Sequence, residues 1–247
     1  MNEVIRLFEP ITLAEMSEVK LMNRIDTKFV TTVQKLTQLF QLAKDAYWIQ
    51  EIEGERNMAY DTTYFDTTDY GMYTEHLHGH TGRQKLRFRT YVSSGLHFME
   101  VKTKNNHNRT KKKRMQVADM NINDSDKKQF LHDHLRYNPD DLQPALNNHF
   151  KRITLVNKAK TERLTIDTCL EFHNPITGVN CDMGNLVIIE LKRDGLCYSP
   201  ILELLRQLHI HPHSFSKYCM GSALSNERLA YNRFKPKLND IRKMLFN

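Results

Sequence analysis

Basic side chains recur at alternate positions in several short segments of this chain. Within residues 83–90, the odd-numbered positions 83, 85, 87 and 89 are all arginine or lysine. Successive side chains of a β-strand point to opposite faces of a sheet, so this spacing predicts a strand with one cationic face. Guanidinium and ammonium groups bind phosphate oxygens through charge-assisted hydrogen bonds. The spacing therefore points to the binding of a polyanion.

Three further segments place charges on one side and apolar residues on the other. The apolar residues stand between the charges, as Met99, Val101, Ile189 and Leu191 do. The alternating charged residues of these segments are Arg24, Asp26, Lys28, Glu100, Lys102, Lys104, Glu190 and Lys192. Four predicted strands thus share a charged face, mostly basic with single carboxylates, and an apolar face.

Two interpretations of this charged face are open. For a single strand the simpler one is a sheet with its core on one side and water on the other. Taken together, the strands favour a ligand, because like charges directly opposite each other are destabilising and a phosphate chain would neutralise them. If the sheet closes with this face inward, its lumen becomes a basic channel. Its few carboxylates would then bind divalent metal ions, which phosphates also ligate.

Hydrophobic periodicity predicts the elements that carry these residues. A period of two predicts strands over residues 24–32, 58–65, 83–92, 96–104, 111–117, 150–156, 161–170 and 186–193. Helical periodicity predicts helices over residues 33–44, 125–135, 200–208, 217–229 and 238–246. No linker divides them, so we expect a single domain over residues 1–247. Its class is α+β, with an antiparallel eight-stranded sheet or barrel flanked by helices.

Composition narrows the function classes. The formal net charge is +7, which suits polyanions in general without choosing among them. The longest aliphatic run, residues 186–189, is far shorter than the roughly 18 residues that a membrane span needs, so a transmembrane protein is excluded. We expect no secretory signal, and the four widely spaced cysteines are typical of reduced thiols. The predicted location is therefore cytoplasmic.

An ordered set of short motifs runs through the chain. The set begins with residues 24–29 and Tyr64-Phe65-Asp66. It continues, in chain order, with Arg87-Phe88-Arg89, Met99-Glu100-Val101-Lys102, residues 162–167, Ile189-Glu190-Leu191-Lys192 and Phe215-Ser216-Lys217-Tyr218. This set resembles the catalytic domain of the vacuolar transporter chaperone (VTC) polyphosphate polymerases, in the triphosphate tunnel metalloenzyme superfamily. The resemblance covers roughly residues 23–221. It implies an eight-stranded antiparallel tunnel whose basic interior holds a nucleoside triphosphate and a growing polyphosphate chain.

The resemblance also implies roles for individual residues. Triphosphate ligands with a catalytic role would be Arg87, Arg89, Arg152, Arg163 and Lys217, and Lys28 and Lys102 would face the same lumen. By alternation Lys85, Lys104 and Lys192 share that face, and with Ser216 they complete the predicted substrate-binding set. Glu190 would bind the metal, Mn²⁺ or Mg²⁺. Lys217 follows Ser216 at a predicted helix start, where free backbone N–H groups attract phosphate.

The resulting hypothesis is a metal-dependent transfer of the γ-phosphate of ATP to inorganic polyphosphate. One rival keeps the fold but hydrolyses triphosphate, using Asp26, Glu100, Asp167 and Glu190. Relatives of that branch begin with E-x-E-x-K, whereas this chain has Arg24-Ile25-Asp26-Thr27-Lys28, which favours the polymerase. A second rival is a non-catalytic barrel that binds polyphosphate or RNA. The chain leaves a membrane partner open.

Two smaller expectations bear on these rivals. Residues 111–114, Lys-Lys-Lys-Arg, are either the solvated end of a hairpin or a basic lip that guides polyanion into the tunnel. We also expect Phe29, Phe88 and Phe98 on the strand faces opposite the charges. Proteins that bind single-stranded nucleic acid combine basic grooves with stacking aromatic residues, so this placement predicts no nucleic-acid partner.

Overall fold

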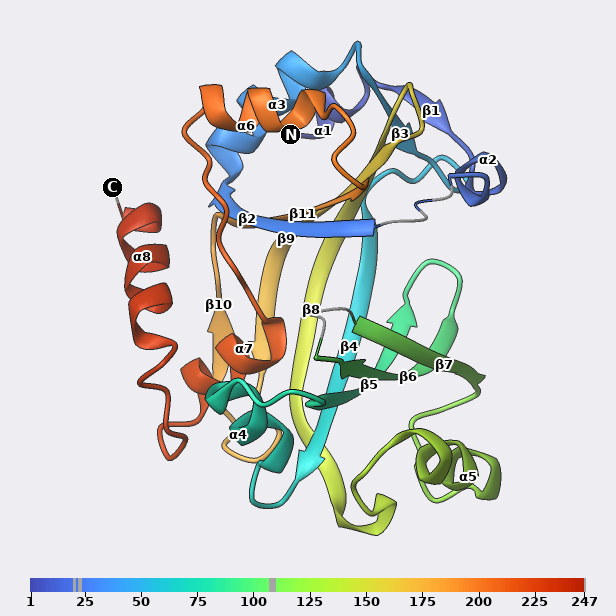
Figure 1. The fold of residues 1–247 in the computed structure, drawn as a ribbon, viewed down its shortest axis with the longest axis vertical. Coiled ribbons are helices and arrows are strands. Elements are labelled where there is room, and N and C mark those ends of the chain that lie inside the picture. Colours follow the sequence, from blue (N-terminus) through green and yellow to red (C-terminus); the bar gives the residue numbers. More distant parts are fainter. Residues whose placement is uncertain (20, 22–23, 107–109, 247) are drawn as a thin grey trace.

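The computed structural model describes residues 1–19, 21, 24–106 and 110–246, and its main element is one 11-stranded sheet (Figure 1). Asn23, where the resemblance begins, lies outside the described residues. The strands are β1 (Glu9–Ile11), β2 (Arg24–Thr32), β3 (Tyr47–Gln50), β4 (Met58–Thr67), β5 (Gln84–Tyr91), β6 (Leu96–Lys104), β7 (Thr110–Val117), β8 (Leu142–Asn157), β9 (Glu162–His173), β10 (Asn180–Asp182) and β11 (Leu186–Asp194).

Helices flank this sheet, as the α+β prediction requires. They are α1 (Asn2–Ile5), α2 (Leu13–Ser17), α3 (Val33–Ala43), α4 (Gly71–His78), α5 (Ser125–His134), α6 (Pro200–Gln207), α7 (Lys217–Ser225) and α8 (Lys235–Phe246), with a 3₁₀ turn at Pro139–Asp141. Within the described part of the chain, none of these helices is long and apolar enough to cross a membrane.

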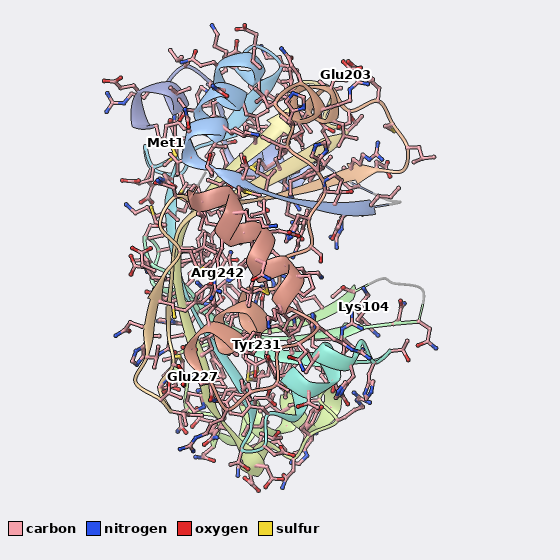
Figure 2. The ribbon with its side chains drawn as sticks, turned by 90° about the vertical axis from the view of Figure 1, so that its left-hand side faces the viewer. Met1, Lys104, Glu203, Glu227, Tyr231 and Arg242 are labelled. Atoms are coloured by element: carbon pink, nitrogen blue, oxygen red, sulfur yellow. The ribbon has the colours of Figure 1, made fainter. Side chains whose placement is uncertain are left out.

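The strands follow the order β2-β11-β9-β8-β4-β5-β6-β7, and every neighbouring pair on this path is antiparallel. Strands β1, β3 and β10 join at its side, and β1 pairs with β3 in parallel. In Figure 1 β2 crosses in front of β9 and β8, and Figure 2 shows that β2 (blue) and the strands beside Lys104 (green) extend in the same direction from the rest of the sheet. Within the described residues β2 and β7 are not paired. The predicted closed eight-stranded barrel is therefore corrected to an open, curved sheet of 11 strands.

Apolar side chains of the predicted faces pack under helices on the convex side. Phe29, Ile189 and Ile166 of β2, β11 and β9 contact α3 and α6 in one buried cluster. Leu86 and Met99 of β5 and β6 contact α5 in another. The opposite, concave side carries the charged positions, and it is called the inner face below. Burial of the convex side thus fixes which side chains point inward.

One end of the inner face is filled by α4, α7 and α8, which share a third buried cluster with Tyr64 and Phe150 of the sheet. Figure 2 shows α8, marked by Arg242, running across one side of the molecule between its upper and lower helices. Helix α7 lies directly against the sheet, because Gly221 has no side chain: a Cβ there would be 2.6 Å from Leu146 Cδ2 and from Phe172 Cδ1. This close contact points the N-terminus of α7 at the inner face.

We expect Gly221→Ala to destabilise the fold, because Leu146 and Phe172 are buried and must shift to admit the methyl group. Overpacking of this kind costs about 1–3 kcal/mol, partly offset by a helix-propensity gain of up to about 1 kcal/mol. Thermal unfolding followed by circular dichroism should show a lower Tm than the parent. Ala223→Gly, on the same helix, should lose the propensity term and the contact of its half-buried methyl group with the core, without any overpacking. An unchanged or raised Tm for Gly221→Ala would contradict this packing.

Candidate functional site

Three adjacent lysines cross the inner face on one side of the site. Lys85 of β5 pairs with Lys102 of β6, which in turn pairs with Lys112 of β7. Lys85 Nζ donates to Ser216 Oγ at 2.8 Å, beside the start of α7. Burial lowers the pKa of Lys85 to about 8 and holds the pKa of Lys102 well below its usual value. Like charges held together without water favour an anionic ligand.

The next row of this face pairs Arg87 of β5 with Glu100 of β6. Arg87 Nε donates to Glu100 Oε2 at 2.7 Å, and Lys112 Nζ donates to the other carboxylate oxygen at 3.0 Å. Burial alone would raise the pKa of Glu100, but Arg87, Arg89 and the neighbouring lysines lower it well below its usual range. Glu100 therefore stays ionised and fixes the direction of the Arg87 guanidinium.

A second carboxylate, Asp167 of β9, organises the centre of the inner face. Arg152 of β8 donates to both its oxygens, at 2.6 and 2.8 Å, and Lys217 at the start of α7 donates to Oδ2. Burial would raise the pKa of Asp167, but these two cations lower it well below its usual range. The ammonium of Lys217 also lies 3.4 Å from the centre of the Phe150 ring. Helix α7 thereby brings a cation to the middle of the sheet.

The third carboxylate is Glu190 of β11, which lies between two lysines. Its Oε2 accepts a hydrogen bond from Lys192 Nζ at 2.7 Å, and Lys28 Nζ lies 3.8 Å from Oε1. Burial would raise the pKa of Glu190, but Lys192 and Lys28 lower it well below its usual range. Its side chain is 24% exposed, so a ligand reaches the ionised carboxylate.

Two arginines of the inner face have no carboxylate within ion-pair distance in the described part of the chain. Arg89 is only 6% exposed, and burial lowers its pKa to about 10. Its nearest polar partner is Thr62, whose hydroxyl accepts from Arg89 Nε at 3.4 Å. Arg163 of β9 has a buried Nε without a hydrogen-bond partner, and burial lowers the pKa of its guanidinium as well. A buried charge without an ionic partner is costly, so a bound anion would stabilise both guanidinium groups.

Charges from unpaired strands face one another across the concave side. Glu190 of β11 interacts electrostatically with Lys102 of β6, and Lys28 of β2 with Lys85 of β5, although neither pair of strands is hydrogen-bonded. The curvature of the sheet therefore brings its two ends together around one site. A ligand there would meet cations from both.

Each residue of the predicted site lies on the inner face or at the N-terminus of α7. Lys104 is at the outer end, where β6 stops, and is labelled in Figure 2. Ser216 caps α7 by accepting from Cys219 N at 3.2 Å. The roles assigned to these residues stay predictions.

Sequence reasoning missed part of this surface. Residues 111–114 are exposed at the start of β7, the second strand of the antiparallel β6–β7 pair, which fits the solvated end of a hairpin, and Lys112 and Arg114 lie opposite Lys102 and Glu100 on the inner face. The alternation of residues 110–117 with β6 could have identified them. The prediction for Phe98 was wrong: it pairs with Arg89, shares the parity of Glu100 and so lies on the charged face. Phe29 and Phe88 do lie on the convex side.

The carboxylates suit a metal that phosphates help to bind. No group of three or more His, Cys, Asp or Glu residues is arranged to hold a metal ion among the described residues. Glu100 and Asp167 are occupied by arginine and lysine, whereas Glu190 is ionised and partly exposed. Mg²⁺ is commonly bound through one or two carboxylates and substrate phosphates, so Glu190 with a bound phosphate chain fits this group.

Comparison with known proteins identifies the relatives of this site. The model of the VTC domain family matches residues 23–226, which include every residue of the inner face described above. The chain belongs to the VTC domain family. No match was found among curated proteins.

Solved structures with a similar fold have low identity to this VTC domain. A candidate adenylate cyclase from Vibrio parahaemolyticus is 11% identical, covers 81% of this chain and 99% of its own, and gives a TM-score of 0.48. HpAC1 from Hippeastrum, an adenylyl cyclase candidate described as having a dominant triphosphatase activity, is 14% identical, with coverages of 82% and 96% and a TM-score of 0.49. The PH1819 protein from Pyrococcus horikoshii is 15% identical, with coverages of 81% and 98% and a TM-score of 0.45.

The lowered pKa of Lys85 predicts a pH-dependent affinity for phosphate chains. We expect the Lys85 ammonium to bind phosphate. Its charge is lost as the pH rises through about 8, so binding by the free protein should weaken between pH 7 and 9. Calorimetric titration with inorganic tripolyphosphate should show a smaller decline for Lys85→Met than for the parent. Protonation of tripolyphosphate itself changes with pH in the same way for both proteins, so the difference between their affinity profiles reports the charge of Lys85. Parallel pH profiles would contradict the assignment.

Proposed function

We propose that this VTC domain is a metal-dependent phosphotransferase that extends inorganic polyphosphate with the γ-phosphate of ATP. The main support is the set of desolvated cations without carboxylate partners, Arg89 and Arg163 foremost, that come from separate strands and face one space. Family membership supports a phosphate-handling enzyme in the same way. Polyphosphate is a chain of closely spaced anionic groups, and such a surface neutralises several of them together.

Phosphoryl transfer requires positioning and charge neutralisation more than covalent help from the protein. Arg89 and Arg163 would hold the phosphates through bidentate hydrogen bonds, a geometry that the planar guanidinium allows. Arg87 and Arg152 are held in direction by Glu100 and Asp167, and each keeps further N–H groups for a ligand. The terminal phosphate of the chain would attack the γ-phosphorus in line, so no nucleophilic side chain is needed.

Other residues of the inner face would guide and neutralise the chain. The lysines proposed to contact phosphates along its path are Lys28, Lys85, Lys102, Lys104, Lys192 and Lys217, with the Ser216 hydroxyl beside them. Glu190 would hold one Mn²⁺ or Mg²⁺ together with phosphate oxygens. Bound there, the ion would supply Lewis-acid stabilisation of charge on those oxygens.

The pairing of carboxylates favours transfer to a chain over hydrolysis. A two-metal hydrolytic site needs several carboxylates that are free to bind metal. Here Glu100 is bound to Arg87 and Lys112, and Asp167 to Arg152 and Lys217. Asp26 lies beside Arg24, with 2.7 Å between Oδ1 and the guanidinium Nε. Of the four, Asp26 and Glu190 are partly exposed, at 35% and 24%, and Glu190 is the one that lies between two lysines of the inner face, which suits one metal ion bound together with phosphates.

Arg89→Ala and Glu190→Ala should each lower the rate of polyphosphate formation by roughly 10²–10³, the usual loss for one preorganised electrostatic contact in a transition state. The assay incubates the protein with ATP and Mn²⁺ and resolves the products on a gel. Lys151→Ala is the matched control, because Lys151 precedes Arg152 on β8 but is exposed on the convex side, and it should leave the rate unchanged.

Each outcome of this assay separates the rival functions. Long phosphate chains indicate the polymerase, and orthophosphate without chains indicates the hydrolase. Binding of polyphosphate with neither product would indicate a non-catalytic protein. Full activity of the purified Arg89→Ala and Glu190→Ala proteins would show that the inner face is not the site of reaction.

A further inference from the structure

A row of four aromatic rings crosses the inner face, next to the proposed phosphate ligands. Phe150 stacks on Tyr60 with ring centres 5.3 Å apart, Tyr60 is 4.9 Å from Tyr91, and Tyr91 is 5.7 Å from Phe98. Phe150 and Tyr60 are buried, whereas Tyr91 and Phe98 are half-buried. The row therefore begins in the core and ends at a partly open pair of rings.

Cations lie over three of these rings, those of Phe150, Tyr60 and Phe98. The Arg89 guanidinium is 5.4 Å from the Tyr60 ring centre, and the Arg114 guanidinium is 5.0 Å from that of Phe98. Arg114 is exposed, and no carboxylate among the described residues lies within ion-pair distance of it. A guanidinium over an aromatic ring stabilises the pair and presents hydrogen-bond donors beside the ring face.

The inner face changes from cationic to aromatic in one direction on two neighbouring strands. On β5 the inward positions run Lys85, Arg87, Arg89 and Tyr91, and the β6 residues paired with them are Lys102, Glu100, Phe98 and Leu96 in turn. Consecutive inward positions on a strand are about 6.6 Å apart. A triphosphate on Arg87 and Arg89 would thus place the group attached to its other end over Tyr91 and Phe98.

We propose that Tyr91 and Phe98, with Arg114, form a nucleobase subsite, an inference that rests on the phosphotransferase function proposed above. A base has a flat π-face that stacks on aromatic side chains, and stacking of this kind tolerates different bases. Inorganic tripolyphosphate has no base that could stack on Tyr91 and Phe98. The subsite would therefore make the protein select nucleoside triphosphates over inorganic triphosphate as the phosphate donor.

The size of the platform favours one base over a nucleic-acid strand. Proteins that follow single-stranded nucleic acid stack successive bases along an extended groove. Here the inner two rings of the row are buried, with Tyr60 at 9% and Phe150 at 0% exposure, so only the outer pair is open to a ligand. A single half-open pair beside a triphosphate site matches a mononucleotide.

The test compares two ligands that differ only in the nucleoside. ATP and inorganic tripolyphosphate are titrated calorimetrically in EDTA, so that binding is measured without turnover. Phe98→Leu and Tyr91→Leu should weaken ATP binding about 10-fold, as loss of one stacking contact does, and leave tripolyphosphate binding unchanged. The matched control is Phe130→Leu on α5, a half-buried ring that contacts His134 on the convex side and should change neither affinity.

A second readout uses the parent protein alone. The triphosphate of 2-aminopurine riboside loses fluorescence when its base stacks, so binding should quench it, and excess ATP should restore the emission while an oligonucleotide should not. Equal effects of Phe98→Leu on both ligands, or no quenching, would overturn the subsite and leave the phosphate site standing. Failure of the parent to bind either ligand, both in EDTA and with Mn²⁺ added, would overturn both proposals. Displacement by oligonucleotide alone would assign the rings to nucleic acid instead.

Discussion

Repulsion among buried cations is the constraint on which this structure depends. Lysines and arginines from opposite ends of the sheet are held together with little water. Among the described residues Glu100, Asp167 and Glu190 compensate most of this charge from within, and Asp26 makes a smaller contribution. Each of the three main carboxylates is shared by two cations, so positive charge is left over. The cations stay close together because the packing of the rest of the fold holds them there, and a bound polyanion would relieve their repulsion.

The buried apolar clusters hold the strands that carry these cations in place. Helices α3 and α6 hold one arm of the curved sheet, α5 holds the other, and α7 fills the end between them. A slip of one residue in any strand would move its cations to the convex side and its core residues inward. The close contact of Gly221 with the sheet likewise positions Lys217, because it sets how close the N-terminus of α7 comes to Asp167.

Alternation in the sequence predicted much of this surface, and its limits are physical. The ranges of β2 and β6 were predicted to the residue, because charged and apolar residues alternate through most of each strand. Strands β1, β3 and β10 are only three or four residues long, too short for a pattern. Helix α4 is only eight residues long, and Asp66, just before it in sequence, accepts hydrogen bonds from Met72 N and Tyr73 N. The alternation of residues within a strand does not show whether the two edge strands of a sheet pair with each other. The predicted closed barrel is therefore not observed, because β2 and β7 are not paired within the described residues. The aromatic row was missed because Phe98 was assigned to the wrong face and Tyr60 lies in the predicted strand at residues 58–65, which is not one of the four with a charged face.

The most direct test of the central claim is a crystal structure of the protein with β,γ-imido-ATP and Mn²⁺. We expect phosphate oxygens at about 3 Å from the guanidinium groups of Arg89 and Arg163, with the metal on Glu190. Phosphates bound to cations of the convex side, with Arg89 and Arg163 free of contact, would contradict the account.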